Sequence, residues 1–261
     1  MNKTNIEWCD STWNPVTGCR HECEYCYARR IAGRFGKRLP DRSGYPESHG
    51  GVHCIDNKIN GNPYPYLFDP TFLPFRLEEP AQKTKPQTIF VCSMADLFGA
   101  WVPDEWIEAV FEACEKAPQH RYLFLTKNPA RYYRLALRGK LPQGDNYWYG
   151  STITSPDDIF WFSGSRNTFV SVEPILAEFP PERIPPLEVV KWAILGAMTG
   201  PGSKEHAPGR ETIYNIVKAA GSPIFMKDSL IPIVGEENML RELPWESNKS
   251  GGQEDEKCKK Q

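Results

Sequence analysis

Three cysteines near the start of the chain constrain it more than any other feature. Cys19, Cys23 and Cys26 are separated by three and then two residues, so one short loop can present three thiolates to a metal centre. Three thiolates hold three irons of a 4Fe-4S cube and leave the fourth iron open to another molecule. The spacing therefore predicts a metal centre that takes part in chemistry.

Two other arrangements of these thiols are open. A disulfide pair with one odd thiol is disfavoured because the first ten residues are polar and charged and show no secretory signal. A zinc site is the serious rival, with His21 or Cys9 as the fourth ligand, because structural zinc prefers four closed ligands. Iron and sulfide content separates the two metal centres.

Residues 19–26 resemble the cysteine motif of radical S-adenosylmethionine (SAM) enzymes, including the aromatic residue, Tyr25, before the third cysteine. The resemblance implies that the open iron binds the amino and carboxylate groups of SAM and that Tyr25 lies at the cofactor. It implies cleavage of SAM to a 5′-deoxyadenosyl radical, with a reductant such as flavodoxin or ferredoxin as partner. The alternative is a zinc- or cluster-stabilised module that binds a partner without catalysis.

Length and composition fit one large domain. The chain has 261 residues, of which 40% are hydrophobic, and a net charge of -2, so it is not basic throughout. No apolar run approaches the roughly 20 residues that span a bilayer, so we expect a cytoplasmic protein with no membrane partner. We expect one domain over residues 1–245, an insertion at about 40–86 rich in proline, glycine and aromatic residues, and a disordered tail over 246–261.

Apolar runs that alternate with amphipathic stretches predict an α/β fold. The expected strands lie at 11–17, 88–92, 121–126, 147–152, 168–172, 191–195 and 223–226. Helices are expected at 29–38, 104–117, about 129–138 and 212–220. Repeated strand and helix units favour a parallel sheet, and their number favours a complete or partial TIM-like (β/α) barrel of the radical SAM type.

Polar residues and glycines follow the expected strands, where barrel enzymes place their ligands. As cofactor-binding residues at these positions we expect Ser93, Asp96, Lys127, Ser151, Thr152, Glu173, Gly196 and Gly200.

The chemistry of SAM suggests a role for most of these residues. The carboxylate of Asp96 suits the amino group of SAM, and the ammonium of Lys127 suits its carboxylate. For each residue alone, a surface salt bridge or a helix cap is an equally good interpretation.

The remaining groups suit the nucleoside part of SAM. Its ribose hydroxyls suit Ser151, Thr152 or Glu173. Gly196 and Gly200 would let the backbone approach the adenine closely.

Several segments are also similar to the phage Gp-thirty-seven/Gp-sixty-eight family of unknown function, which is itself similar to radical SAM proteins. The similarity runs from about Ile6 to Lys227, and its segments lie at 13–19, 26–28, 96–98, 125–127, 170–174 and 225–227. The chain departs from that family in two places. Its first cysteine gap is shorter than in many members, and residues 196–200 read Gly-Ala-Met-Thr-Gly where many have Gly-Gly-Glu-Ser-Gly, which removes a carboxylate.

The phage association makes nucleic acid or a nucleotide the expected substrate, with modification or repair as the reaction. A basic run after the cysteines agrees with this, although a solvated helix face is the simpler interpretation of that run. The run comprises Arg29, Arg30, Arg34, Lys37, Arg38 and Arg42.

The other cysteines need separate interpretations. Cys114 recurs with apolar neighbours at helical spacing and is expected in the core, while Cys258 lies in the tail. Cys9 and Cys54 have no assigned role. Cys92 ends an expected strand, so it is a candidate catalytic residue that returns a hydrogen atom to a substrate radical; the alternative is a buried strand cysteine.

Overall fold

The computed structural model describes residues 1–38, 51–221 and 223–246. They form two compact units, one of residues 1–152 and 159–167, the other of residues 153–158 and those after 167. Residues 40–50 of the expected insertion and 247–261 of the expected tail lie outside the described residues.

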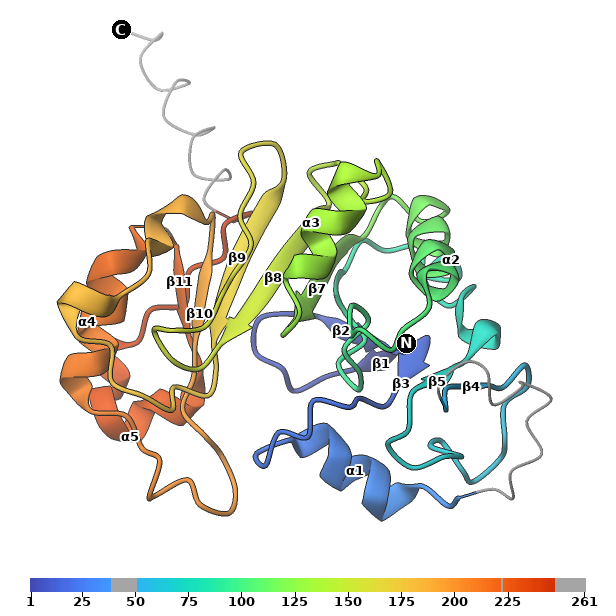
Figure 1. The fold of residues 1–261 in the computed structure, drawn as a ribbon, viewed down its shortest axis with the longest axis horizontal. Coiled ribbons are helices and arrows are strands. Elements are labelled where there is room, and N and C mark those ends of the chain that lie inside the picture. Colours follow the sequence, from blue (N-terminus) through green and yellow to red (C-terminus); the bar gives the residue numbers. More distant parts are fainter. Residues whose placement is uncertain (39–50, 222, 247–261) are drawn as a thin grey trace, which may run out of the picture. The chain divides into compact units, whose positions relative to one another are not determined.

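The first unit is built on a mostly parallel sheet, shown in Figure 1. Its strands run in the order β1 (Asn2–Lys3), β2 (Ser11–Trp13), β6 (Thr88–Val91), β7 (Arg121–Thr126) and β8 (Tyr147–Ile153). β1 is antiparallel to β2, and the other neighbours are parallel. β2 and β6 are buried along their whole length, as expected for strands covered on both faces.

Two helices follow β6 and β7 and cover the sheet of the first unit. α2 (Asp104–Glu115) and α3 (Ala130–Leu137) place apolar side chains in one core with the aromatic residues of β7 and β8. Cys114 is fully buried in α2, as its helical spacing predicts. The core thus fixes the carboxyl ends of β6 and β7, where the candidate site lies.

A smaller sheet in the first unit includes the strand that directly precedes the cysteine loop. β3 (Val16–Thr17) pairs with β5 (Thr71–Phe72), which pairs with β4 (His53–Cys54). The prediction of one strand over 11–17 is wrong, because the chain leaves the large sheet after Trp13 and Pro15 lies between β2 and β3. The predicted insertion therefore contributes two strands that support the loop.

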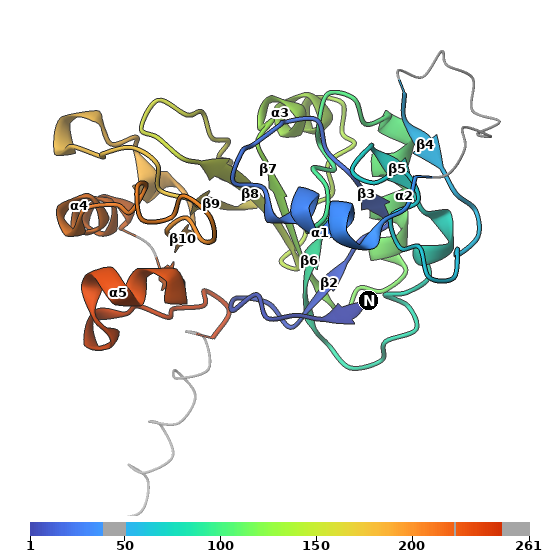
Figure 2. The ribbon, with the colours of Figure 1, turned by 90° about the horizontal axis from the view of Figure 1, so that it is seen from below.

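The cysteine loop ends in helix α1 (Tyr27–Phe35), which lies in front of β2 and β6 in Figure 2. The predicted helix over 29–38 begins and ends too late. At the start of the helix, the Cys26 Sγ accepts a hydrogen bond from the Arg29 N–H and so caps the first turn. The helix ends at Gly36, whose backbone is extended.

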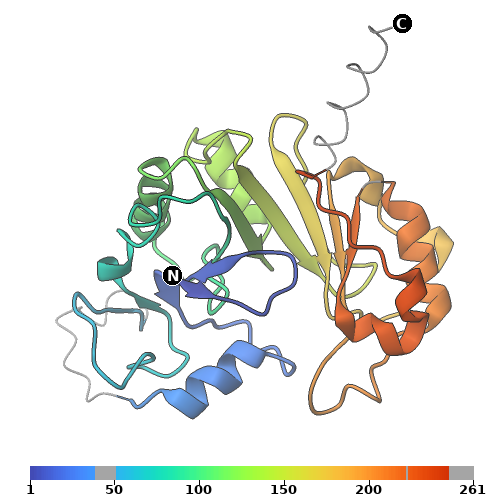
Figure 3. The same ribbon diagram turned by 180° about the vertical axis from the view of Figure 1, so that it is seen from behind.

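The second unit has a parallel sheet of β9 (Asn167–Val172), β10 (Ala193–Leu195) and β11 (Ile224–Met226). α4 (Arg210–Ala220) and α5 (Ile231–Val234) belong to the same unit, as Figure 3 shows. Gly221 ends α4 with a φ of 57°, as predicted from its position after the helix. Short 3₁₀ helices complete the two units at Pro74–Arg76, Pro181–Arg183, Leu187–Val189, Asp228–Leu230 and Glu236–Asn238.

The prediction of an α/β fold with mostly parallel sheets is confirmed. The strand order of the described residues does not return on itself, so no closed barrel is formed within that part of the chain. No helix in the described ranges is both long and apolar enough to cross a bilayer.

Candidate functional site

The cysteine loop begins at Gly18, which leaves no room for a side chain. A Cβ on Gly18 would lie 2.2 Å from the carbonyl oxygen of Asp69, and its φ is +85°. The Gly18 N–H donates to the carbonyl of Met94 at 2.8 Å, and the Cys19 N–H donates to that of Phe68 at 3.0 Å. The backbone of the loop is thus held between the segment before β5 and the end of β6.

All three cysteines of the loop are free, half-buried thiols. The pKa of the Cys19 thiol is raised to about 12, chiefly by burial; a backbone hydrogen bond at His21 lowers it, and the nearby Asp96, Cys23 and Cys26 add smaller increases. The Cys26 N–H donates to the Cys23 carbonyl at 3.1 Å, and the Cys26 Sγ accepts from the Arg29 N–H. The Cys26 end of the loop is thus fixed at the start of α1.

Within the described ranges, no three Cys, His, Asp or Glu side chains lie close enough together to hold one metal ion. In a 4Fe-4S cube each thiolate binds a different iron, so its ligands lie further apart than those of a single ion. Analysis of bound iron and sulfide therefore distinguishes a cluster from a zinc site.

Asp96 joins the cysteine loop to the sheet. The Asp96 carboxylate accepts hydrogen bonds from His21 Nε2 at 2.7 Å, from the Thr126 hydroxyl at 2.7 Å, and from the backbone N–H groups of Phe98 and Lys127 at 2.9 Å. The side chain is buried, so these bonds form at low effective dielectric. Both carboxylate oxygens are occupied by this chain, which favours a positioning role over contact with the amino group of SAM.

His21 is held from two directions. Besides its bond to Asp96, its ring meets that of Trp101 edge-on, with 4.9 Å between the ring centroids. The Trp101 Nε1 is buried and finds no hydrogen-bond partner in the part of the chain that the structure describes. Because Nε2 of His21 is already bonded to a carboxylate, the imidazole serves best as the link between the loop and Asp96.

Tyr25 in the cysteine loop and Tyr27 at the start of α1 contact residues that follow β7 and β6. Lys127 Nζ donates to the Tyr25 hydroxyl at 2.8 Å and lies 5.3 Å from the centre of its ring. The Tyr27 hydroxyl donates to the Ser93 carbonyl at 2.8 Å. The structure therefore brings together four predicted regions of the site: the thiols, Tyr25, the 93–96 turn and Lys127.

Asn14 organises the turn that carries Ser93, although no role for it was predicted. Its Oδ1 accepts from the Ser93 hydroxyl at 3.2 Å and from the Met94 N–H at 2.9 Å. The only signal was its place in the Trp-Asn-Pro segment before the cysteines. The Ser93 hydroxyl is thus turned toward Asn14.

Cys92 belongs to the core of the first unit. It is 2% exposed, packs with the apolar residues between the sheet and α2, and has a φ of 58°. Burial raises the pKa of its thiol to about 12. These observations favour the buried strand cysteine over the hydrogen-atom donor.

Ser151 and Thr152 lie within β8 and not after it. Ser151 is fully buried, and its hydroxyl accepts from the Trp161 N–H at 3.0 Å, while Thr152 is half-buried. The Ser151 hydroxyl supports the chain that returns to the first unit, so Thr152 is the better candidate of the two for a hydroxyl contact.

The remaining predicted residues lie in the second unit. Lys227 Nζ donates to Glu173, and the two side chains are 20% and 26% exposed. A Cβ on Gly196 would lie 3.1 Å from the Glu173 side chain, so glycine there leaves room for this ion pair. Gly200 lies in an exposed turn with a φ of +86°. In this unit the predicted residue Glu173 thus takes part in an ion pair. Its partner Lys227 was not among the expected site residues.

Comparison with known proteins gives one match. The model of a family described as "Protein of unknown function (DUF5131)" matches residues 3–229. No curated protein and no solved structure matches the chain.

Proposed function

We propose that this chain, which belongs to the DUF5131 family of proteins of unknown function, is a radical SAM enzyme. Cys19, Cys23 and Cys26 would hold a 4Fe-4S cluster, and the open iron would bind SAM. Once bound, the two cofactors supply a 5′-deoxyadenosyl radical for attack on a substrate. The observation that supports the proposal is a loop of three free thiols anchored at the carboxyl ends of parallel strands β6 and β7.

The donor set suits an iron-sulfur cluster. Thiolates are soft ligands, and these three are half-buried, which limits solvent access to a bound cluster. The backbone bonds of Gly18 and Cys19 and the cap at Cys26 fix both ends of the loop. The two ends of the loop that would hold the cluster are therefore fixed by hydrogen bonds within the chain.

The neighbouring residues have distinct roles in this proposal. Asp96 and His21 position the loop, because all their observed bonds are within the protein. Lys127 keeps an ammonium group beside Tyr25, where a carboxylate such as that of SAM would find a cation. Glu173, Gly196 and Gly200 remain predictions for the nucleoside part.

The test is production of 5′-deoxyadenosine. After anaerobic reconstitution with iron and sulfide, the full chain should take up about four irons and, once reduced with dithionite, should convert SAM to 5′-deoxyadenosine. Chromatography of the nucleoside products measures the outcome. A protein with a complete cluster that produces none would favour the binding module without catalysis, and uptake of zinc alone would favour the zinc site.

We propose nucleic acid as the substrate class because α1, which starts at the third cysteine, presents basic side chains to solvent. Arg29, Arg30 and Arg34 of α1 are exposed, and so is Lys37 just after the helix, whereas Arg38 is paired with Asp69 at 2.7 Å. Exposed Glu22 and Glu24 precede the helix and reduce the local charge. Arg42 lies outside the described residues.

Salt dependence tests this substrate class. Binding of a single-stranded oligonucleotide should weaken with added salt, and the double variant Arg34→Gln, Lys37→Gln should reduce the slope of log K against log[salt] by about 1 to 2. These two positions leave the bonds of the cysteine loop intact. The matched control Lys83→Gln, Lys85→Gln changes two exposed lysines in another segment. An equal slope in the α1 variant would indicate a solvated helix face.

A further inference from the structure

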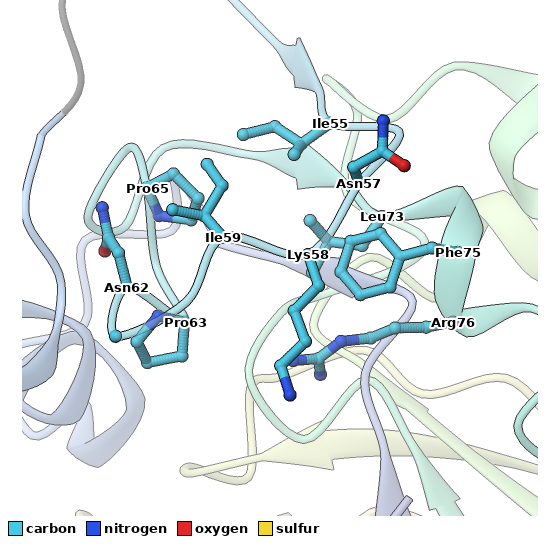
Figure 4. A pocket seen from close by; sticks show the side chains of 11 residues that line it. Ile55, Asn57, Lys58, Ile59, Asn62, Pro63, Pro65, Leu73, Phe75 and Arg76 are labelled. Carbon is cyan, nitrogen blue, oxygen red and sulfur yellow. The ribbon is translucent and has the colours of Figure 1, made fainter.

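A pocket in the first unit is separate from the residues of the cysteine-loop site. It lies between the segment after β4 and the 3₁₀ helix Pro74–Arg76, as Figure 4 shows. Much of its wall is apolar, with Ile55, Ile59, Leu73 and Phe75 among the lining residues. Apolar walls with a few polar groups are typical of sites for small molecules.

Two cations, Lys58 and Arg76, line the same pocket, and they lie on the Phe75 side of the view in Figure 4. Arg76 is fixed at the end of β2, because its carbonyl accepts from Trp13 Nε1 at 2.8 Å and its Nη1 donates to the Asn14 carbonyl at 3.3 Å. Its Nε is buried and has no hydrogen-bond partner among the described residues. Within that part of the chain, this half-buried guanidinium therefore donates one hydrogen bond, and its Nε is not satisfied.

Within the described ranges, no ion pair includes either Lys58 or Arg76. The acidic side chains that follow Arg76 in the sequence are engaged elsewhere, Glu78 with Lys116 and Glu79 with the N-terminal amine. Of the described residues that line the pocket, none is acidic. A partly desolvated guanidinium without a counter-charge costs free energy, which a bound anion would recover.

We propose that this pocket binds the phosphate group of a small phosphorylated ligand. Arg76 supplies the planar fork of donors that matches phosphate oxygens. Lys58 is exposed, and its flexible side chain adds a second positive charge that can move toward the ligand. The apolar wall takes the body of the ligand. This site does not use the thiols, so it is independent of the proposed radical chemistry.

Calorimetric titration of the full chain with pyrophosphate, at fixed ionic strength, tests the site without any cluster. We expect saturable binding that Arg76→Gln weakens about tenfold or more, equivalent to about 1.4 kcal/mol. Lys58→Gln should weaken it about threefold, because one flexible surface charge contributes less. Arg76→Lys keeps the charge but not the fork and should fall between wild type and Arg76→Gln.

Lys83→Gln, which removes an exposed lysine outside the pocket, is the matched control and should bind like the wild type. Circular dichroism checks that the variants are folded. If Arg76→Gln does not fold, Lys58→Gln decides, since its side chain is exposed. Absence of saturable binding, or equal affinity in Lys58→Gln and the wild type, would overturn the proposal.

Discussion

Alanine at Cys19, Cys23 or Cys26 is expected to abolish the brown colour that the reconstituted protein should show. Two thiolates cannot hold the cube in this loop, so the iron and sulfide bound per chain should fall to a background level. Visible absorbance and metal analysis measure both. Cys114→Ala is the control: this thiol is fully buried in α2, and its loss should cost packing stability but leave the cluster intact.

A serine variant separates the two roles of Cys26. Its Sγ caps α1, and serine is a good residue at that position, so Cys26→Ser should keep the helix and the thermal stability while it loses the cluster. Full iron and sulfide content in this variant, or in any alanine variant of the three, would contradict the assignment.

Asp96→Ala is expected to lower the free energy of unfolding by about 3 to 5 kcal/mol. The change leaves the Thr126 hydroxyl and the N–H groups of Phe98 and Lys127 without their acceptor, and a buried group left unpaired costs about 1 to 3 kcal/mol. It also releases His21 and with it the cysteine loop. Urea denaturation followed by circular dichroism measures the loss.

Two further variants test this assignment of Asp96. Asp96→Asn keeps the size and one acceptor oxygen and should lose less stability than the alanine variant. Asp157→Ala is the surface control: its carboxylate is 76% exposed and pairs with Arg183, so its loss should cost less than about 1 kcal/mol. If Asp96→Ala stays as stable as this control, the proposed link between loop and sheet is wrong.

The sequence predicted the strands that have long apolar runs. The expected strands at 121–126 and 147–152 agree with β7 and β8 to within one residue. It did not predict β1, β4 or β5, because each has two residues and is set by pairing with a distant segment. The break at Pro15 was visible in the sequence, yet only the pairing of β3 with β5 shows that the two strands belong to different sheets.

For the candidate site, the sequence predicted where the residues lie better than it predicted what each residue does. Asp96 and Lys127 were found because they follow buried strands, and the structure places both beside the cysteine loop. Their partners could not be predicted, since the His21 bond to Asp96 joins residues 75 positions apart. Trp101 had no motif to mark it. Cys92 was assigned from its place after a strand, whereas its burial depends on how the sheet packs against α2.

The distant anchors of the cysteine loop have a consequence for biosynthesis. The three thiols leave the ribosome before the segments that fix their loop, because its bonds come from Phe68, Met94, Asp96 and Lys127. Contacts of such long sequence separation form only after the later segment has been made. Until Lys127 has emerged, the nascent loop therefore has exposed, reactive thiols and no fixed shape. Any metal delivered to it would have to arrive after that point in translation or be held by a carrier until then.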